Sequence, residues 1–329
     1  MFFSLVVNVI CKYSVTASAR ASASSGAQTC LIRIARELTR SLRTSSSFLR
    51  VSRTMTTGME VQRCLMDSCV SEPQSTDSAI TMLQLLANGK EHQDKQLCFS
   101  CNEQLVPTSN IVEHQSVFRE GRGGSILHLK CQPCNKTVCV YVCGQWWSLR
   151  EILHSNRMDR NGFQQVQTFT ERVILHTLNR IVFREQEQDE DTVAVFLPTP
   201  AEEFAKLMWD EGEAVGFYTV KTKGKVYESS FHERYTMPVV DIIFVRKKGR
   251  GLGFGENLLK DMVSMFPVEN FGFSHPVSPA MYQVLLRYLH SRPHMRDRIW
   301  VTTYTGDEGY RRNVWLLVRH LATNVDSTD

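Results

Sequence analysis

The sequence lacks any apolar run that could cross a bilayer as a helix. Such a helix needs about 20 consecutive apolar residues, and the run nearest the N-terminus, FFSLVVNVIC at 2–11, is far shorter. No basic residue precedes this run, so it fits a secretory signal poorly, although the small residues ASA that follow are typical of a cleavage site. The sequence therefore predicts no transmembrane segment.

Acidic residues are nearly missing from positions 1–58, where Glu37 is the only one. The basic residues of this segment are Lys12, Arg20, Arg33, Arg36, Arg40, Arg43, Arg50 and Arg53. The segment thus carries a formal charge of +7, which leaves −3 for the remainder, because the whole chain has a net charge of +4. A remainder with that balance has no overall basic footprint for nucleic acid, and no nucleic-acid partner is expected.

The composition of 1–58 sets it apart from the part of the chain that is expected to fold. It is poor in acid and rich in Arg, Ser and Ala, which is typical of a mitochondrial transit peptide. The alternative is a disordered extension, with translation starting at Met55 or Met59. We assign 1–58 as a disordered or transit-like leader.

Two common phosphate-binding loops are also absent. The Walker pattern fails because no Gly-Lys-Ser/Thr occurs, and G-x-G-x-x-G fails because Phe254, Glu256 and Leu258 stand where its last glycine would be. What remains is VRKKGRGLGFGENLLKDM at 245–262, a strand end, a basic glycine-rich turn and an amphipathic helix. Glycines let a backbone turn sharply, and a helix N-terminus attracts anions, so the turn predicts an anion site. A surface turn with solvated lysines is the alternative.

The R-x-x-G-x-G pattern of this turn resembles the acyl-CoA signature of the GNAT acetyltransferase superfamily. The matching residues are Val245, Arg250, Gly251, Gly253, Phe254 and Gly255. Lys247 stands where the superfamily's V-x-P-x-x-R-G form has proline. The resemblance implies that the turn holds the pyrophosphate of acetyl-CoA, and that the thioester oxygen meets the backbone N–H of Val245 or its neighbour.

Acetylation of an amine also needs a base and an acid. An amine with the ordinary lysine pKa of about 10.4 is protonated near neutral pH and cannot attack until it loses a proton. Asp241, on the strand that enters the turn, is the candidate base, and an ordinary strand-end polar residue is the alternative. The GNAT resemblance implies a tyrosine acid on the helix after the next strand, which is Tyr282, with Tyr288 as second choice. Either could be a half-buried aromatic, and His275 is assigned to the core or to a strand end.

Four of the ten cysteines form two C-x-x-C pairs. They are Cys98 and Cys101 in CFSCNE, and Cys131 and Cys134 in CQPCNK. Each pair is followed by an asparagine, Asn102 or Asn135, which can take the left-handed conformation that turns backbone N–H groups toward the sulfurs. The spacing predicts a structural zinc site of the ribbon type, with small buried cysteines as the alternative. No H-x-E pattern indicates a catalytic zinc.

The order of predicted elements indicates an α+β protein. The second cysteine pair falls in a hairpin turn between strands at 125–130 and 137–142, and the apolar spacing of 169–191 predicts an amphipathic helix of about five turns. The elements predicted beyond it are a strand at 192–198, a helix at 200–212, strands at 213–223 and 235–245, the turn and its helix, a strand at 270–277, a helix at 278–290 and a strand at 298–305. This order predicts a GNAT-like mixed central sheet flanked by helices, preceded by a smaller α+β region with the cysteine-bearing hairpin. The predicted domains are 59–191 and 192–322, with a tail at 323–329.

Longer phrases resemble the soluble lamin-associated protein family, vertebrate proteins with a GNAT-like domain and a link to the nuclear envelope. These phrases are GQWWSLREIL, ERVILHTLNRIVFREQE, GEAVGFYTVKTKG, MPVVDIIFVRKKGRGLGFG and SPAMYQVLLRYL. The likeness covers 126–312. It implies a nuclear or nucleocytoplasmic protein with nuclear-envelope components as partners, and a mitochondrial one is the alternative if the leader is real. The lamin-associated member has a long extension beyond this region, so lamin association is not carried over.

Two functions follow from these observations. The first is an N-acetyltransferase that uses acetyl-CoA and a protein or small amine as acceptor. The second is a noncatalytic interaction module that keeps the GNAT fold. The three glycines of the turn favour the enzyme, and nothing in the sequence identifies the acceptor.

Overall fold

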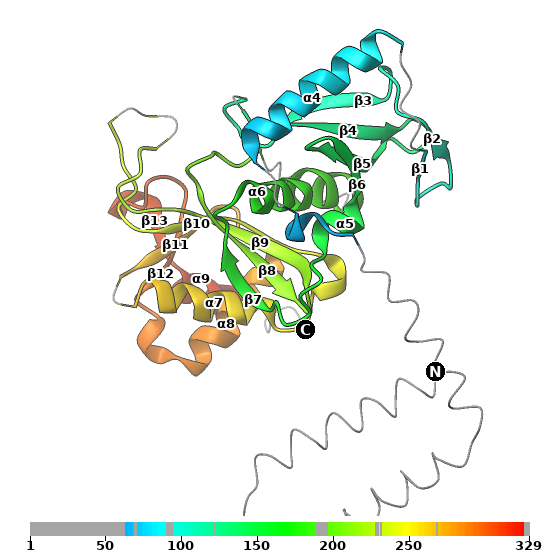
Figure 1. The fold of residues 1–329 in the computed structure, drawn as a ribbon. Helices are drawn as coiled ribbons and strands as arrows, with labels where there is room; N and C mark the ends of the chain where they lie inside the picture. The colour runs from blue at the N-terminus through cyan, green and yellow to red at the C-terminus, as the bar shows by residue number, and fades with distance from the viewer. Residues whose placement is uncertain are drawn as a thin grey trace, which may run out of the picture. The chain divides into compact units, whose positions relative to one another are not determined.

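Two β-sheets and a small hairpin organise the part of the chain that the structure describes. This computed structural model describes residues 63–68, 71–89, 95–121, 123–188, 197–227, 230, 232–267 and 269–325 (Figure 1). They belong to one compact unit that starts at Gln62. The leader assigned to 1–58 lies outside the described residues.

An antiparallel four-stranded sheet in the order β3-β4-β5-β6 comes first. Its strands are β3 (Val112–Ser116), β4 (Ser125–Cys131), β5 (Lys136–Val142) and β6 (Gln145–Ser148). The pairing of β4 with β5 confirms the predicted cysteine-bearing hairpin. Because side chains alternate along a strand, Val140 of β5 enters one core and Tyr141 enters another on the opposite face. A separate two-stranded hairpin, β1 (Gln96–Leu97) and β2 (Gln104–Leu105), carries the first cysteine pair.

A mixed seven-stranded sheet in the order β13-β12-β11-β10-β9-β8-β7 follows. Its strands are β7 (Gly162–Gln165), β8 (Phe204–Asp210), β9 (Glu213–Lys221), β10 (Val239–Val245), β11 (Phe271–Ser274), β12 (Ile299–Thr302) and β13 (Arg311–Asn313). β10, β11 and β12 run parallel, and the other neighbours are antiparallel. The sheet confirms the α+β class and the predicted strands before and after the glycine turn.

The helix predicted at 200–212 is wrong, because this segment contains strand β8. Ala205, Leu207 and Trp209 alternate onto one buried face, as a strand antiparallel to β9 requires. The apolar residues of FAKLMW fit a helical period as well as a strand period. This segment forms a strand because residues on both of its faces are buried within the sheet. The strand predicted at 192–198 falls largely outside the described residues.

One long helical segment lies between the two sheets. α6 (Phe169–His176) begins with a capping box, in which Thr168 and Glu171 bond each other's backbone N–H groups, and continues as the π-helix η2 (Thr177–Glu187). This confirms the helix predicted from residue 169. Val173 and Leu178 of this segment share a core with Val140 of β5 and Phe217 of β9. The short helices η1 (Leu65–Asp67) and α5 (Leu149–Leu153) pack at the same core.

The remaining helices cover the outer faces. α4 (Glu72–Ala87) packs on the free face of the four-stranded sheet. α7 (Phe254–Met265), α8 (Pro279–Ser291) and α9 (Val314–Val325) cover the face of the seven-stranded sheet that α6 does not touch. The 3-10 turns η3 (Lys247–Gly249), η4 (Pro293–Met295) and η5 (Glu308–Tyr310) connect elements of this half. Among the described residues, no helix combines the length and apolar character needed to cross a membrane.

Candidate functional site

The four predicted cysteines come together between the β1–β2 hairpin and the β4–β5 turn. The Sγ atoms of Cys98, Cys101, Cys131 and Cys134 all lie within 4.8 Å of one another. Cys98 and Cys134 are 3.6 Å apart, and Cys101 and Cys131 are 3.4 Å apart. All four thiols are free, and such a cluster could hold a metal ion.

The two cysteine loops have the local geometry that the sequence predicts. Asn102 has a φ of 61° and Asn135 a φ of 52°, both in the left-handed region. Burial raises the pKa of Cys98, but hydrogen bonds from the backbone N–H groups of Cys101 and Ser100 outweigh it and bring the pKa to about 7. Backbone N–H groups directed at the Cys98 sulfur favour its thiolate, which is the form that binds metals, whereas burial raises the pKa of Cys131 to about 12.

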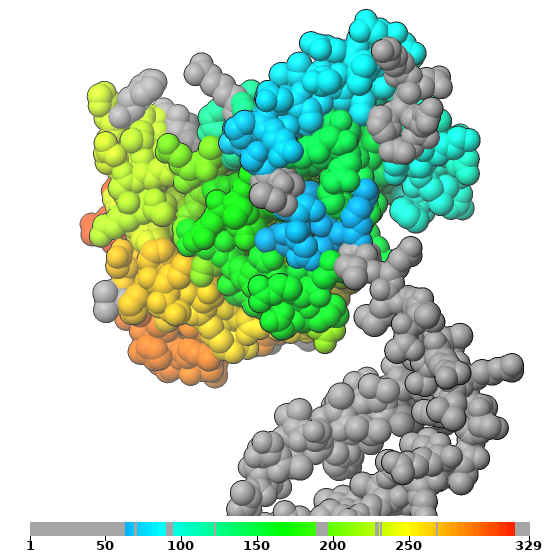
Figure 2. Space-filling model, in the orientation of Figure 1, coloured from blue at the N-terminus to red at the C-terminus, as the bar shows by residue number. Residues whose placement is uncertain are grey.

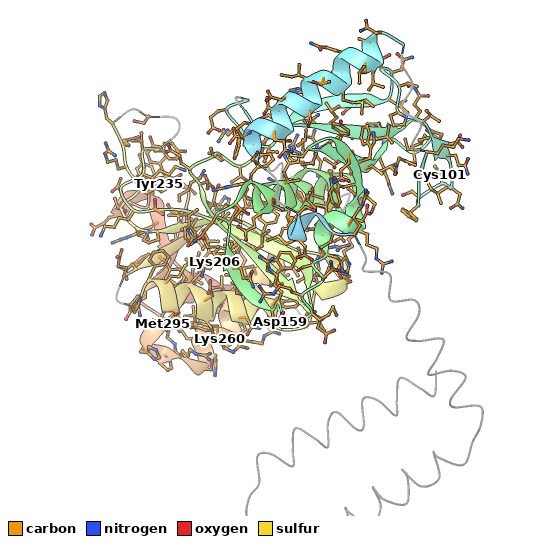
Figure 3. All side chains as sticks on the ribbon, in the orientation of Figure 1. Cys101, Asp159, Lys206, Tyr235, Lys260 and Met295 are labelled. Atoms are coloured by element: carbon orange, nitrogen blue, oxygen red, sulfur yellow. The ribbon has the colours of Figure 1, made fainter. Side chains whose placement is uncertain are left out.

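The spacing of the sulfurs fits a tetrahedral metal site. Four ligands with Zn–S bonds of about 2.3 Å place neighbouring sulfurs about 3.8 Å apart. The two cross-loop distances of 3.6 and 3.4 Å lie close to that value. One cysteine is exposed and the others are buried or half-buried, so the cluster lies at the surface, where Figure 3 labels Cys101 on the β1–β2 hairpin.

The second candidate site lies where two parallel strands separate. β10 pairs with β11 only at Val239 and Val240, which face Gly272 and Phe273. Beyond these positions, β10 continues to Val245 and, among the described strands, pairs with β9 alone. The backbone N–H of Arg246 donates to Val215 of β9, so the backbone groups of Val245, one residue earlier, point into the opening.

The glycine turn follows directly from β10 and begins α7. Gly251 has a φ of 82°, and Gly253, the N-cap of α7, has a φ of 86°, a region that favours glycine. A β-carbon at either position would meet no other atom within 4 Å, so both backbones face open space. The first N–H groups of a helix have no partner within it, and the described residues give Phe254 and Gly255 none elsewhere. The turn therefore offers backbone donors to an anion.

The basic side chains at the start of this turn already form ion pairs with acidic side chains of the same protein. Arg246 and Lys248 both pair with Glu213, whose side chain is 17% exposed. The backbone N–H of Lys247 donates to Glu187 at 2.6 Å. Arg250 donates from Nε to the carbonyl of Val245 at 3.1 Å. An anion in the turn would meet glycine backbone rather than unpaired Arg246 or Lys248 side chains.

Phe254 and Gly255, the remaining predicted residues of the turn, make packing contacts on its buried side. A β-carbon at Gly249 would lie 3.2 Å from the ring of Phe254, so this ring packs under the turn. A β-carbon at Gly255 would lie 3.1 Å from Val284 of α8, so this glycine lets α7 and α8 approach closely. Gly255 therefore serves helix packing, whereas Gly251 and Gly253 face the open side.

Asp241 lies where β10 and β11 begin to separate. Its Oδ1 accepts a hydrogen bond from Ser274 of β11 at 2.9 Å, and its Oδ2 lies 3.5 Å from Nζ of Lys221. The side chain is 30% exposed. The candidate base is therefore oriented by two partners, and it stands several residues along the strand from Val245.

The candidate acids differ in their surroundings. Tyr282 is half-buried on α8, and burial raises its pKa while the nearby Arg312 opposes this effect. Tyr288 is buried, with the guanidinium of Arg292 over its ring at 4.4 Å. Tyr282 is the more accessible of the two. His275 follows the end of β11 and is exposed, which confirms a strand-end position and excludes the core.

Sequence reasoning missed the ion network around Lys221. Its Nζ lies 2.7 Å from Glu203, whose side chain is 1% exposed, and Glu203 also pairs with Lys225 at 3.2 Å. Through Lys221 this network reaches Asp241. Lys221, the last residue of the strand EAVGFYTVK, directly follows the apolar Val220, and this is the one local signal that could have indicated it.

Comparisons with known proteins identify relatives in two vertebrates. The chain is 37% identical to mouse Protein FAM169B over 239 residues, which make up 71% of each chain. It is 43% identical to human Protein FAM169BP over 121 residues, which cover 36% of this chain and 63% of that protein. No protein-family profile matches the sequence, and no solved structure matches it.

These relatives agree with the vertebrate family that the phrases at 126–312 suggest, while their names carry neither a lamin association nor an acetyltransferase domain. The mouse relative is matched over more than two thirds of both chains. The chain belongs to the FAM169B family.

Proposed function

We propose that the chain binds acetyl-CoA at the glycine turn and transfers the acetyl group to an amine, as a GNAT-type N-acetyltransferase. One observation carries the proposal: parallel strands β10 and β11 separate after Val240, and the opening leads to a left-handed glycine turn at the N-terminus of α7. A pyrophosphate fits this turn because its backbone is open and a helix dipole points at it.

The proposed roles are assigned to residues of the turn and of β10, which border this opening, and to Tyr282 of α8. The backbone at Gly251 and Gly253 leaves room for phosphate oxygens, and the N–H of Val245 would donate to the thioester oxygen. Asp241 would accept the proton of the incoming ammonium group. The neutral amine would then form the C–N bond to the carbonyl carbon, and as the C–S bond breaks, Tyr282 would give its hydroxyl proton to the leaving thiolate while the second proton lost by the nitrogen returns to Tyr282 through water.

The first test is calorimetric titration of acetyl-CoA into the full chain and into Gly253→Val. We expect binding to the wild type and its loss in the variant, because a valine at φ 86° distorts the turn and fills the open side. Gly224→Val is the matched control, since Gly224 also has a φ of 82° and open space, but lies in the loop after β9. Equal binding by both variants, or none by the folded wild type, would overturn the proposal.

A second experiment separates the enzyme from a noncatalytic module that uses the same fold. The module is favoured by one observation, the engagement of both Asp241 oxygens by Ser274 and Lys221. Acetyl transfer to a library of amines and lysine peptides should be abolished by Asp241→Asn, while acetyl-CoA binding persists. Binding without transfer in the wild type would support the module.

We also propose that the four clustered cysteines bind one structural zinc ion. Four thiolates complete the tetrahedral coordination and leave no position for a reacting water, so the metal would stabilise the fold. The zinc would join β1–β2, a hairpin of two residues per strand, to the β4–β5 turn. A hairpin this short is not stable alone.

Zinc content measured by elemental mass spectrometry tests this proposal. We expect about one zinc per chain in the wild type and its loss in Cys131→Ser. Cys143→Ser is the control, because Cys143 lies after β5 and outside the cluster. Wild-type protein that is folded, reduced and free of zinc after growth in zinc-containing medium would contradict the proposal.

A further inference from the structure

The four clustered cysteines divide into two pairs, each of which joins the two cysteine loops. Cys98 of the first loop lies 3.6 Å from Cys134 of the second, and Cys101 lies 3.4 Å from Cys131. Each cysteine belongs to one pair, so two disulfides could form at the same time. The two sulfurs of a pair would need to approach by about 1.5 Å to reach the disulfide bond length of about 2.05 Å.

Each pair combines an accessible sulfur with a buried one. Cys101 is exposed and its neighbour Cys131 is buried, while Cys134 is half-buried and its neighbour Cys98 is buried. Figure 2 shows the β1–β2 hairpin, whose loop carries the first two cysteines, at the edge of the described surface. An oxidant in solvent therefore meets Cys101 first, and the buried sulfur beside it is placed to complete a disulfide bond.

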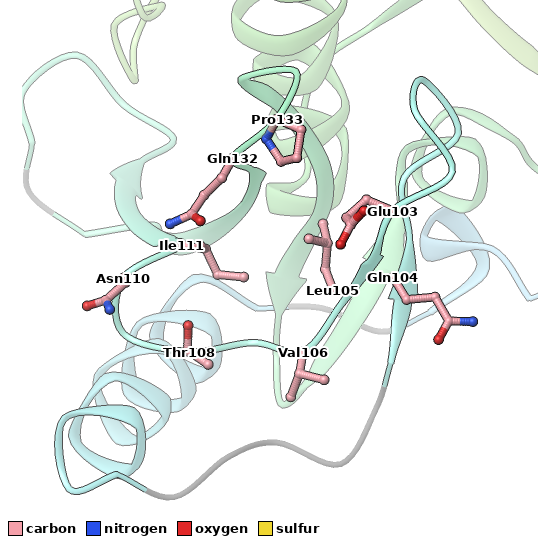
Figure 4. A pocket seen from close by; sticks show the side chains of 9 residues that line it. All are labelled: Glu103, Gln104, Leu105, Val106, Thr108, Asn110, Ile111, Gln132 and Pro133. Atoms are coloured by element: carbon pink, nitrogen blue, oxygen red, sulfur yellow. The ribbon is translucent and has the colours of Figure 1, made fainter.

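An open hollow of about 620 Å³ lies against both cysteine loops (Figure 4). Its lining includes Gln132 and Pro133, the two residues between Cys131 and Cys134, and also Glu103, which follows the first loop. Solvent therefore borders both loops on this side. A molecule as small as hydrogen peroxide can approach them there.

We propose that the cluster is a site of reversible oxidation, at which peroxide converts the four thiolates into the disulfides Cys101–Cys131 and Cys98–Cys134 and releases the zinc. In each pair the accessible thiolate attacks an oxygen of hydrogen peroxide, so that an S–O bond forms, the O–O bond breaks and hydroxide leaves. The buried thiolate then attacks this sulfur, and the S–S bond forms while the S–O bond breaks with loss of a second hydroxide. Each pair thus loses two electrons to one peroxide, and the metal, deprived of its thiolate ligands, dissociates as Zn²⁺.

The disulfides would keep the β1–β2 hairpin in place after the metal leaves. Both join the loop of this hairpin to the β4–β5 turn, which are the two segments that zinc would also join. A crosslink between segments distant in the chain restricts the unfolded state. The oxidised, zinc-free protein should therefore unfold at a higher temperature than the reduced, zinc-free protein. The release of metal rests on the proposed zinc site, whereas the disulfide pairing does not.

Mass spectrometry of the full chain after treatment with hydrogen peroxide tests the pairing. Proteolysis without reductant should yield the two cysteine loops joined to each other, fragmentation should assign the two proposed disulfides, and a thiol reductant should reverse both. The internal controls are Cys64 and Cys139, which are buried and, among the described residues, contact the oxygens of Asp67 and Gln96, so they should remain thiols. Disulfides within a loop, another pairing, no disulfide, or equal oxidation of the two controls would overturn the proposal.

Zinc release into a chelating dye, followed on the same samples, tests the loss of metal. We expect zinc to appear as the thiols of the cluster disappear. Disulfide formation with zinc still bound would contradict the release of metal. Wild-type protein that is isolated without zinc, yet forms both disulfides, would refute the zinc site and support the site of oxidation.

The variant Cys131→Ser tests the order of the two steps. Without the buried thiolate beside it, the sulfenic acid on Cys101 should persist and be trapped by a dimedone probe. Cys143→Ser is the matched control, because Cys143 lies outside the cluster and its loss leaves both pairs intact. Circular dichroism establishes that both variants are folded. Equal trapping at Cys101 in the two folded variants would contradict the role of Cys131.

Discussion

At the scale of residues, two buried histidines stand out. His128 of β4 and His176 of α6 are both buried, and their Nε2 atoms lie 3.3 Å apart. Burial lowers the pKa of His176 to about 3, and burial together with His176, Lys130 and Arg180 lowers the pKa of His128 well below its ordinary value. Both rings therefore stay neutral in the folded protein, with one ring nitrogen donating to the other.

The histidine pair predicts a loss of stability in mild acid. Unfolded histidines take up protons at a pKa of about 6.5, whereas His176 does not until about pH 3. The free energy of unfolding should therefore be unaffected by the pair above pH 6.5 and fall as the pH drops below it, by at most about 1.4 kcal/mol per pH unit for each ring. Urea unfolding over a pH series measures this slope.

A variant isolates one ring of the pair. His176→Phe should be less stable at neutral pH, yet show a shallower slope between about pH 6 and 5, because one of two proton uptakes is removed. His232→Phe is the control, since His232 is exposed and should leave the slope unchanged. An identical slope in wild type and His176→Phe would mean that the buried ring is already protonated.

The glycines of the turn are expected to differ in why they resist substitution. Gly253→Ala should cost about 1–2 kcal/mol through its left-handed backbone, whereas Gly255→Ala places a β-carbon 3.1 Å from Val284. Adding Val284→Ala should reduce the cost of Gly255→Ala and leave that of Gly253→Ala unchanged. Unfolding free energies of the single and double variants measure the coupling of each glycine to Val284. Equal coupling to both glycines would refute a packing role for Gly255 and a backbone role for Gly253.

At the scale of elements, local patterns predict well where the deciding forces are local. The hairpin between β4 and β5 and the helix from Phe169 follow from residue periodicity, and the four-cysteine cluster follows from two C-x-x-C pairs, each followed by an asparagine. β8 was missed because its apolar residues fit both periods, and only its pairing with β9 fixes it as a strand.

Contacts that join distant segments could not be predicted in this way. Glu203, Lys221 and Asp241 stand before β8, at the end of β9 and within β10, so no spacing in the sequence brings them together. The same holds for Gly255, whose contact with Val284 depends on the packing of two helices. Tertiary packing therefore assigns these residues their roles.

The ion pair between Glu203 and Lys221 predicts a large effect from a small change. Glu203→Gln keeps the shape of the side chain but leaves Lys221, whose side chain is 7% exposed, without its nearest counter-charge. Removing one partner of a buried pair costs about 3 kcal/mol or more of unfolding free energy. Glu202→Gln next to it is exposed and should change stability by less than about 0.5 kcal/mol. Urea unfolding compares them, and equal effects would contradict a buried pair.

At the scale of the whole molecule, the two sheets are joined through one core. Leu178 of η2 shares one core with Val140 from the first sheet and with Phe217 and Phe244 from the second. β7 precedes the boundary predicted at 191/192, yet it pairs with β8, which follows it. The predicted boundary rests on a change of composition near residue 191. Composition does not reveal which sheet a strand joins, so it could not show that β7 belongs to the second sheet.

This shared core predicts how fragments of the chain behave. A fragment of 192–329 loses β7 and the α6–η2 segment, which exposes one face of the seven-stranded sheet, including Phe217 and Phe244. Apolar surface of that extent is not tolerated in water, so the fragment should remain unfolded or aggregate. A fragment of 62–329 keeps the whole compact unit and should unfold in one cooperative transition. Circular dichroism and amide-dispersion spectra distinguish these states, and a well-dispersed spectrum from 192–329 would show that the second sheet folds without the helix that covers it.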